Sequence, residues 1–297
     1  MLEVLILGTA AGGGLPQWNC ACANCQLARE GALSPRLQSG LAISGNGRDW
    51  HLINASPDIG LQLERYLRPR ATLSGPRSNP VGRIFLTNAD LDHTLGLFQL
   101  REGGSLSLGA PSKVRSSIEE GLQLDRVVGA YAQVQWQGAS RDWQTVDESG
   151  LEVRCVPLSG GGPPRYDSGA GEGLHAVGYL FRNGGETVGI FPDVAILDEA
   201  LLEELAGCTR VWFDGTFWDE EELVRLGFST RRAADMGHVP ISGESGSLAA
   251  LSELGPGRVS YLHINNTNPI LRPDSPERRA VEEAGLQVAE DGGHFII

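Results

Sequence analysis

Three cysteines near the start of the chain have the spacing C-x-C-x2-C, namely Cys20, Cys22 and Cys25. Zinc prefers four tetrahedral thiolate or imidazole ligands, and three closely spaced thiolates can surround one face of such an ion. The fourth ligand must come from elsewhere, and His238, in Gly-His-Val-Pro, is the candidate. The alternatives are reduced cysteines packed in a loop and a redox-sensing cluster, although unligated thiols at this density oxidise readily. The spacing predicts a structural zinc site.

A second set of ligand types follows the apolar run 83–87, where Asn88 precedes Asp90, Asp92 and His93. Because Asp92 and His93 are adjacent, an irregular turn would let both side chains point at one ion. Asp90 shares a face with Asp92 if this segment is extended. The alternative is that Asp90 and Asp92 cap a helix beginning near His93.

Two further ligand types end apolar runs far downstream. Asp193 follows the run 186–191, and His263 ends the run 258–263. Side chains at the ends of several strands meet in a crevice at the rim of a fold, which favours metal binding over helix capping alone. The predicted ligands are Asp92, His93 and His263, with Asp90 and Asp193 as additional ligands or supports.

Other functional classes find little support in the sequence. The glycine-rich turn 8–14 has neither a Walker lysine nor the G-x-G-x-x-G spacing, so it is interpreted as close backbone packing. A G-x-S-x-G serine hydrolase motif is absent. The formal charge of −13 disfavours nucleic acid and anionic membranes as partners, and no run of eighteen apolar residues occurs. The cysteine pattern does not resemble a secreted disulfide framework, which favours the cytoplasm.

The elements that position these residues follow from the alternation of apolar runs and turns. Strands are predicted at 2–7, 40–45, 50–55, 83–87, 105–108, 151–156, 175–182, 186–191, 210–214, 258–263 and 286–289. Helices are predicted at 58–67, 94–101, 113–124, 196–206, 219–226, 241–254 and 275–284. This mixture favours an α/β fold in which two sheets pack face to face with helices outside, an αββα sandwich. With 297 residues, a single domain over 1–297 is expected. The Gly/Pro/Ser-rich segment 159–174 is interpreted as a loop near the active site rather than a linker.

Four longer strings carry a resemblance: GTAAGGGLPQWNCACANC at 8–25, NASPDIG at 54–60, MGHVPIS at 236–242 and HINNTNPIL at 263–271. They resemble the coenzyme PQQ synthesis protein B family of the metallo-β-lactamase superfamily, from end to end of the chain. The resemblance implies the metallo-β-lactamase fold. The cysteine segment is also similar to that of the phosphodiesterase of phosphonate breakdown, where a distant histidine completes a structural zinc. By that resemblance His238 joins the three cysteines.

The chain departs from the superfamily's metal-binding motif, H-x-H-x-D-H. At that place it has Asn88, Asp90, Asp92 and His93, so both histidines of the first metal position are missing. A later histidine of that position would fall near 157–159, where none occurs. The resemblance matches Asp193 to the bridging aspartate and His263 to the last histidine. A two-zinc hydrolase is therefore disfavoured.

One carboxylate and two imidazoles with open positions suit non-haem Fe(II) and oxygen chemistry, although zinc or manganese would also bind them. The resemblance implies an iron-dependent oxygenase that uses O2 to hydroxylate the tyrosine ring of a Glu-Tyr unit derived from a precursor peptide. Arg101 is a candidate to receive substrate carboxylates. The alternatives are a carrier moving PQQ or its precursor toward the periplasm and a zinc hydrolase. The expected partners are the peptide-derived substrate, other PQQ biosynthesis proteins and, as an open alternative, a second copy of the chain.

Overall fold

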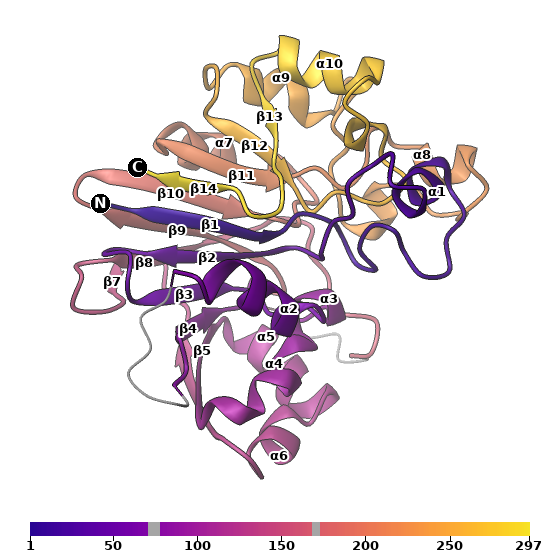
Figure 1. Ribbon diagram of the computed structural model, residues 1–297. Helices are drawn as coiled ribbons and strands as arrows, with labels where there is room; N and C mark the ends of the chain where they lie inside the picture. Colours follow the sequence, from indigo (N-terminus) through magenta and orange to yellow (C-terminus); the bar gives the residue numbers. More distant parts are fainter. Residues whose placement is uncertain (71–77, 168–172) are drawn as a thin grey trace.

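The computed structural model describes residues 1–70, 78–167 and 173–297, and its centre is a pair of seven-stranded sheets packed face to face (Figure 1). In spatial order, the first sheet contains β14 (His294–Ile296), β1 (Glu3–Gly8), β2 (Gly40–Ser44), β3 (Trp50–Ile53), β4 (Val81–Phe85), β5 (Ser105–Ala110) and β6 (Gln133–Gly138). The second contains β13 (Gln287–Val288), β12 (Val259–Leu262), β11 (Arg210–Asp214), β10 (Glu186–Phe191), β9 (Val177–Asn183), β8 (Glu152–Pro157) and β7 (Gln144–Thr145).

Each sheet is half parallel. Strands β3 to β6 run parallel in the first sheet, and β10 to β13 run parallel in the second. The carboxyl ends of parallel neighbours lie at the same edge of a sheet, so loops that leave them can bring side chains together there. The residues that follow β4, β10 and β12 are those predicted as metal ligands.

Both faces of each sheet are buried, which explains why the strands read as continuous apolar runs. In β1, Val4 and Ile6 pack between the sheets with Trp212, while Leu5 and Leu7 belong to the cluster on the opposite face. Successive side chains of a strand point to opposite faces, so this six-residue strand contributes to two cores. A third cluster lies under the helices of the second sheet.

Helices cover the outer faces, short on the first sheet and longer on the second (Figure 1). Those of the first sheet are α2 (Ile59–Gln62), continued by a π-helical turn at Leu63–Leu67, α3 (Leu91–Thr94), α4 (Gly96–Gln99), α5 (Ser112–Ser116) and α6 (Leu124–Val128). The second sheet carries α7 (Glu199–Ala206), α9 (Ser247–Ser252) and α10 (Pro276–Glu283). Two more, α1 (Ala23–Arg29) and α8 (Glu222–Arg225), lie beyond the end of the sandwich.

The predicted αββα sandwich is confirmed, and each predicted strand ends within two residues of its predicted bounds. Helix 241–254 is shorter than predicted because the chain from 240 to 246 forms turns before α9 begins. Residues 168–172 of the predicted loop 159–174 lie outside the described residues. Among those described, no helix has the length and apolar character needed to cross a bilayer.

Candidate metal centres

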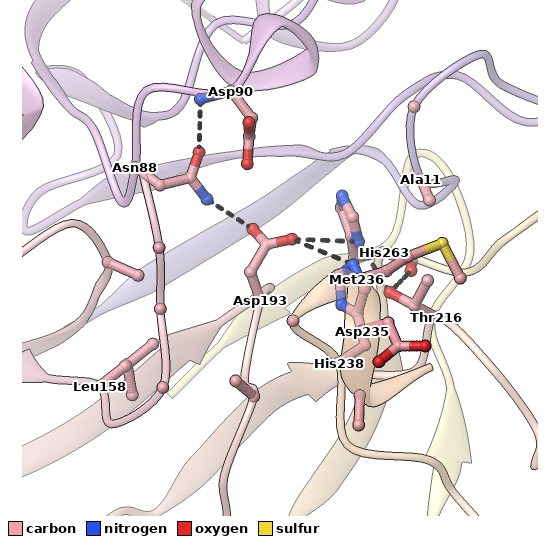
Figure 2. A pocket seen from close by; sticks show the side chains of 18 of the residues that line it. Ala11, Asn88, Asp90, Leu158, Asp193, Thr216, Asp235, Met236, His238 and His263 are labelled. Carbon is pink, nitrogen blue, oxygen red and sulfur yellow. Dashed lines mark hydrogen bonds and ion pairs between the residues drawn. The ribbon is translucent and has the colours of Figure 1, made fainter. Parts of the chain in front are cut away.

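A cavity of about 520 Å³ opens where the loops after β4, β10, β11 and β12 converge (Figure 2). Asp92, Asp193, His238 and His263 all line it. The described part of the loop 159–174 forms one wall through residues 160–163, as expected for a loop beside an active site. Four ligand-type side chains from separate segments therefore face one space.

Asp92, His93 and His263 form one compact ligand group, whose donor atoms all lie within 4.8 Å of one another. Nε2 of His263 is 3.1 Å and Nε2 of His93 is 3.6 Å from Oδ2 of Asp92. Nε2 of His93 is buried, and its contacts with the carboxylates of Asp92 and Asp193 are ion-pair contacts that lack hydrogen-bond geometry. Because buried polar atoms normally have a well-oriented partner, a metal ion held between these residues fits as the missing partner of this nitrogen.

The backbone and a hydroxyl together orient His263. It follows β12 directly and has a left-handed backbone, with φ of +56°. Oγ1 of Thr216 lies 2.9 Å from Nδ1 of His263 and donates its own proton to Oδ1 of Asp214 at 2.7 Å. The hydroxyl therefore accepts the Nδ1 proton of His263, which leaves Nε2 as the nitrogen that a metal ion beside Asp92 would bind.

His93 is fixed in a similar way from the other side. Asn54, which also has a left-handed backbone with φ of +64°, contacts Nδ1 of His93 through its side-chain amide. The same amide bonds to Thr87, so it cannot move freely. The ring consequently turns Nε2 toward the carboxylates, 3.0 Å from Oδ2 of Asp193.

Asp193 lies between two possible ion positions. Asn88 donates from Nδ2 to Oδ2 of Asp193 at 2.9 Å, so the residue that replaces the superfamily's first histidine holds this carboxylate in place (Figure 2). Asp193 also forms a second ligand group with His238 and His263. In that group Nε2 of His238 is 4.0 Å and Nδ1 of His263 is 3.6 Å from Oδ1 of Asp193.

The prediction that His238 completes the cysteine site is wrong. His238 lies in the cavity, where Asp214 holds its Nδ1 at 2.7 Å and its ring stacks on that of His263 at 5.6 Å. The physical reason is the buried carboxylate of Asp214 at the end of β11, which attracts the imidazole toward the rim. The sequence does not single out Asp214 or Thr216, because neither residue belongs to a recognisable ligand motif.

The two groups share His263, and this limits how they can be occupied. A neutral imidazole binds a metal through one nitrogen, and the Thr216 contact leaves that role to Nε2. The group containing Asp193 and His238 lies on the Nδ1 side. The arrangement therefore favours one ion at Asp92, His93 and His263, with His238 stacked beside His263.

The charges of the cavity favour a cation. Burial alone would lower the pKa of His93, but Asp193 and neighbouring carboxylates raise it to about 9. The pKa of His263 is likewise raised against burial by Asp193, and that of His238 by Asp214. The carboxylates thus hold protons on the imidazoles when no metal is bound, and a divalent ion would supply the same positive charge.

Asp90 and Arg101 are placed differently from the ligand group. Burial, together with Asp193 and Asp92, raises the pKa of Asp90, which lines the cavity but belongs to neither ligand group. Asp90 stands at the N-cap position of α3 without a side-chain capping bond, so the capping alternative is not supported. Arg101 does not line the cavity; it pairs with Glu102 and lies against Tyr131.

The sulfur atoms of Cys20, Cys22 and Cys25 form a third candidate ligand group, all within 4.8 Å of one another and in no disulfide. Nδ2 of Asn266 lies 3.0, 3.5 and 3.2 Å from these sulfurs in that order. Rotating the amide by 180° would present Oδ1 instead, which can bind an ion. Asn266 therefore occupies the place predicted for His238. Residue spacing alone does not predict this contact, because an amide is a rare zinc ligand.

The cysteine group is built into the surrounding structure. Asn24 of α1 donates to the backbone oxygens of Asn266 and Asn268 at 3.0 and 2.9 Å. Burial raises the pKa of Cys22 to about 12, so this thiol stays protonated unless a bound cation stabilises the thiolate. The donor set fits a closed structural zinc site with three thiolates.

Replacing Cys22 by serine is expected to release about one zinc ion and to lower the melting temperature. Structural zinc binding is coupled to folding, so its loss lowers the free energy of unfolding. A decrease of about 3 kcal/mol would lower Tm by roughly 6–12 °C in a domain of this size. Zinc analysis and calorimetry measure both effects. Cys208→Ser is the control, because Cys208 is buried away from the cysteine group and bonds the backbone oxygen of Glu204. Wild-type zinc content and melting in Cys22→Ser would contradict the assignment.

Comparisons with known proteins agree on the fold of this chain. Residues 49–264 match the family model described as the β-lactamase superfamily domain. The chain is 41% identical over 300 residues to coenzyme PQQ synthesis protein B of Methylobacterium radiotolerans and 40% identical over 299 residues to that of Methylobacterium nodulans; each alignment covers 98% of both chains. The crystal structure of Zn²⁺-bound PqqB from Methylobacterium extorquens has a TM-score of 0.92 and 37% identity, covering 99% of this chain and 100% of that one. A diphosphatase of the PhnP family shares the fold, with a TM-score of 0.68 and 19% identity, covering 100% of this chain and 98% of that one.

Proposed function

This chain belongs to the coenzyme PQQ synthesis protein B family, and on that premise we propose that it acts in PQQ biosynthesis as an iron-dependent oxygenase. Its substrate is a Glu-Tyr unit derived from a precursor peptide, and its reaction is hydroxylation of the tyrosine ring. One atom of O2 enters the ring, and the other leaves as water at the expense of two electrons from an external reductant.

The observation that carries this proposal is the ligand group of Asp92, His93 and His263, of which Asp92 and His263 line the cavity. One carboxylate and two imidazoles are the ligand set used by non-haem Fe(II) oxygenases. A bound Fe(II) supplies redox chemistry with O2 that none of the surrounding side chains can supply. Asn88 stands where a two-zinc hydrolase would place a ligand and instead donates to Asp193, which supports a single ion.

The remaining polar groups orient these ligands and handle protons. Thr216 fixes His263, and Asn54 fixes His93. His238, with Nδ1 held by Asp214, presents Nε2 to the cavity and can accept or return a proton at that atom. We assign a structural zinc to Cys20, Cys22 and Cys25 with Asn266 as the fourth ligand.

Isotope labelling tests the reaction. Iron-loaded protein is incubated with a Glu-Tyr substrate, a reductant and ¹⁸O2, and the product is measured by mass spectrometry. The tyrosine ring is expected to gain 16 mass units for the oxygen atom and two more for the label. A carrier would return the substrate unchanged. A hydrolase would take its oxygen from water, so label appearing only from H2¹⁸O would overturn the oxygenase proposal.

A further inference from the structure

Two guanidinium groups line the cavity that holds the candidate ligands. Arg165 comes from the described end of the loop after β8, and Arg231 comes from the segment between α8 and the turn Ala234–Met236. Among the described residues, Arg165 and Arg231 are the two Arg or Lys residues that line this cavity. They reach it from two separate parts of its wall.

Neither guanidinium is neutralised by a described carboxylate. Arg231 is half-buried and donates to the backbone oxygen of Asp235, while the Asp235 carboxylate accepts from the backbone N–H of Arg232 at 2.9 Å. Arg165 is exposed and takes part in no ion pair among the described residues. Two positive charges therefore face the cavity with their donor groups still available.

Other arginines near these positions are used differently, which makes the contrast specific. Arg232, the neighbour of Arg231, pairs with Glu221 at 2.7 Å and does not line the cavity. Arg225 on α8 pairs with Asp219 at 2.6 Å. Arg232 and Arg225 thus pair with carboxylates of the chain itself, whereas Arg231 lines the cavity and pairs with no described carboxylate.

Unpaired positive groups are unexpected in a cavity with this many carboxylates. The formal charge of the chain is −13, and the cavity contains the carboxylates of Asp90, Asp92 and Asp193. An anionic ligand would be repelled from such a space unless fixed positive groups received it. A bidentate guanidinium is the side chain best suited to bind a carboxylate, because its planar donors match the two oxygens.

We propose that Arg165 and Arg231 bind two carboxylates of the substrate and so hold it in the cavity over the Asp92, His93 and His263 group. This inference rests on the proposed function, because it identifies the ligand as a Glu-Tyr-type molecule with two carboxylates. A cavity of about 520 Å³ is within the range of small-molecule sites and suits a ligand of dipeptide size. The two arginines set which end of that ligand lies nearest the ligand group.

Binding to zinc-loaded protein tests the proposal without chemistry. The probes are the dipeptide Glu-Tyr, Gln-Tyr, which lacks the side-chain carboxylate, and Glu-Tyr amide, which lacks the terminal one. The variants are Arg165→Gln and Arg231→Gln, with Arg232→Gln as the matched control. Each of the first two is expected to weaken Glu-Tyr binding about 10- to 100-fold by calorimetry, the usual loss for one charge-assisted hydrogen-bonded contact.

The neutral analogues decide whether the loss is due to carboxylate binding. Each of the two variants should bind Glu-Tyr more weakly than the wild type does. It should also bind one analogue more weakly, namely the one that keeps the carboxylate bound by the replaced arginine. For the other analogue, which lacks that carboxylate, its affinity should equal that of the wild type. Arg232→Gln should bind all three probes normally. Equal losses for all three probes, no loss, an equal effect of Arg232→Gln, or no Glu-Tyr binding by the wild type would each overturn the proposal.

The same experiment separates this proposal from the proposed reaction. Probe discrimination by the arginines without any ring hydroxylation by iron-loaded protein would overturn the oxygenase and leave the carboxylate site in place. Hydroxylation by the wild type with no discrimination among the variants would overturn the carboxylate site alone.

Discussion

Iron-loaded protein is expected to hydroxylate the tyrosine ring, whereas zinc-loaded protein of the same fold is expected to show no turnover above background. The donor set of Asp92, His93 and His263 accepts either ion, so both forms should be fully loaded. Zinc has no redox chemistry and cannot activate O2, so only the iron form can carry out the reaction. Apoprotein refilled anaerobically with each metal, then assayed for O2 consumption and hydroxylated product, provides the measurement.

Two controls make this metal comparison decisive. Circular dichroism and zinc content at the cysteine group should be identical in the two forms, because that group is separate from the cavity ligands. Metal analysis should give one exchangeable ion per chain, as the shared use of His263 requires. Equal turnover by the zinc form, or none by either, would reject the oxygenase and return the carrier or the hydrolase to first place.

Replacing His263 by alanine is expected to lower turnover by at least about 100-fold and to empty the cavity of iron. Loss of a residue that only supports a metal ligand lowers metal affinity or activity 10- to 100-fold, and loss of a ligand should exceed this. The nitrogen removed lies 3.1 Å from Asp92, so the remaining two ligands no longer enclose an ion. Iron content and steady-state turnover report the two effects separately.

The matched control is His294→Ala, which removes an imidazole that pairs with Glu3 at 2.8 Å and does not line the cavity. Its iron content and turnover should equal those of the wild type. The fold and the zinc at the cysteine group should survive in both variants. Normal iron binding by His263→Ala would exclude His263 as a ligand.

Most of the sandwich is predictable from sequence because its strands are buried on both faces. Strands such as β1 and β10 appear as apolar runs bounded by turns. The strands that the sequence does not predict lie at the edges of the sheets. In β6 the polar sequence QVQWQG leaves much of the strand exposed, while β7 has only two residues and β14 only three. An edge strand needs one paired neighbour and little burial, so its sequence carries a weak signal.

The candidate site is predictable only in part, for a different reason. Asp92, His93, Asp193 and His263 stand out because they follow strong strand signals, and the structure brings them together. His238 has no such context, and its position depends on Asp214, which is 24 residues away in the chain and itself ends a strand. Contacts of this kind are set by tertiary packing, which local spacing does not encode.

His263 occupies its position against the preference of its backbone. Its φ of +56° lies in the left-handed region, which costs an L-residue about 1–2 kcal/mol of conformational free energy and causes no steric strain in glycine. At this position selection for stability and selection for chemistry therefore act in opposite directions. Directed evolution for heat resistance could relax this backbone with glycine only if other residues replaced the buried contacts of the imidazole with Thr216, His93 and His238.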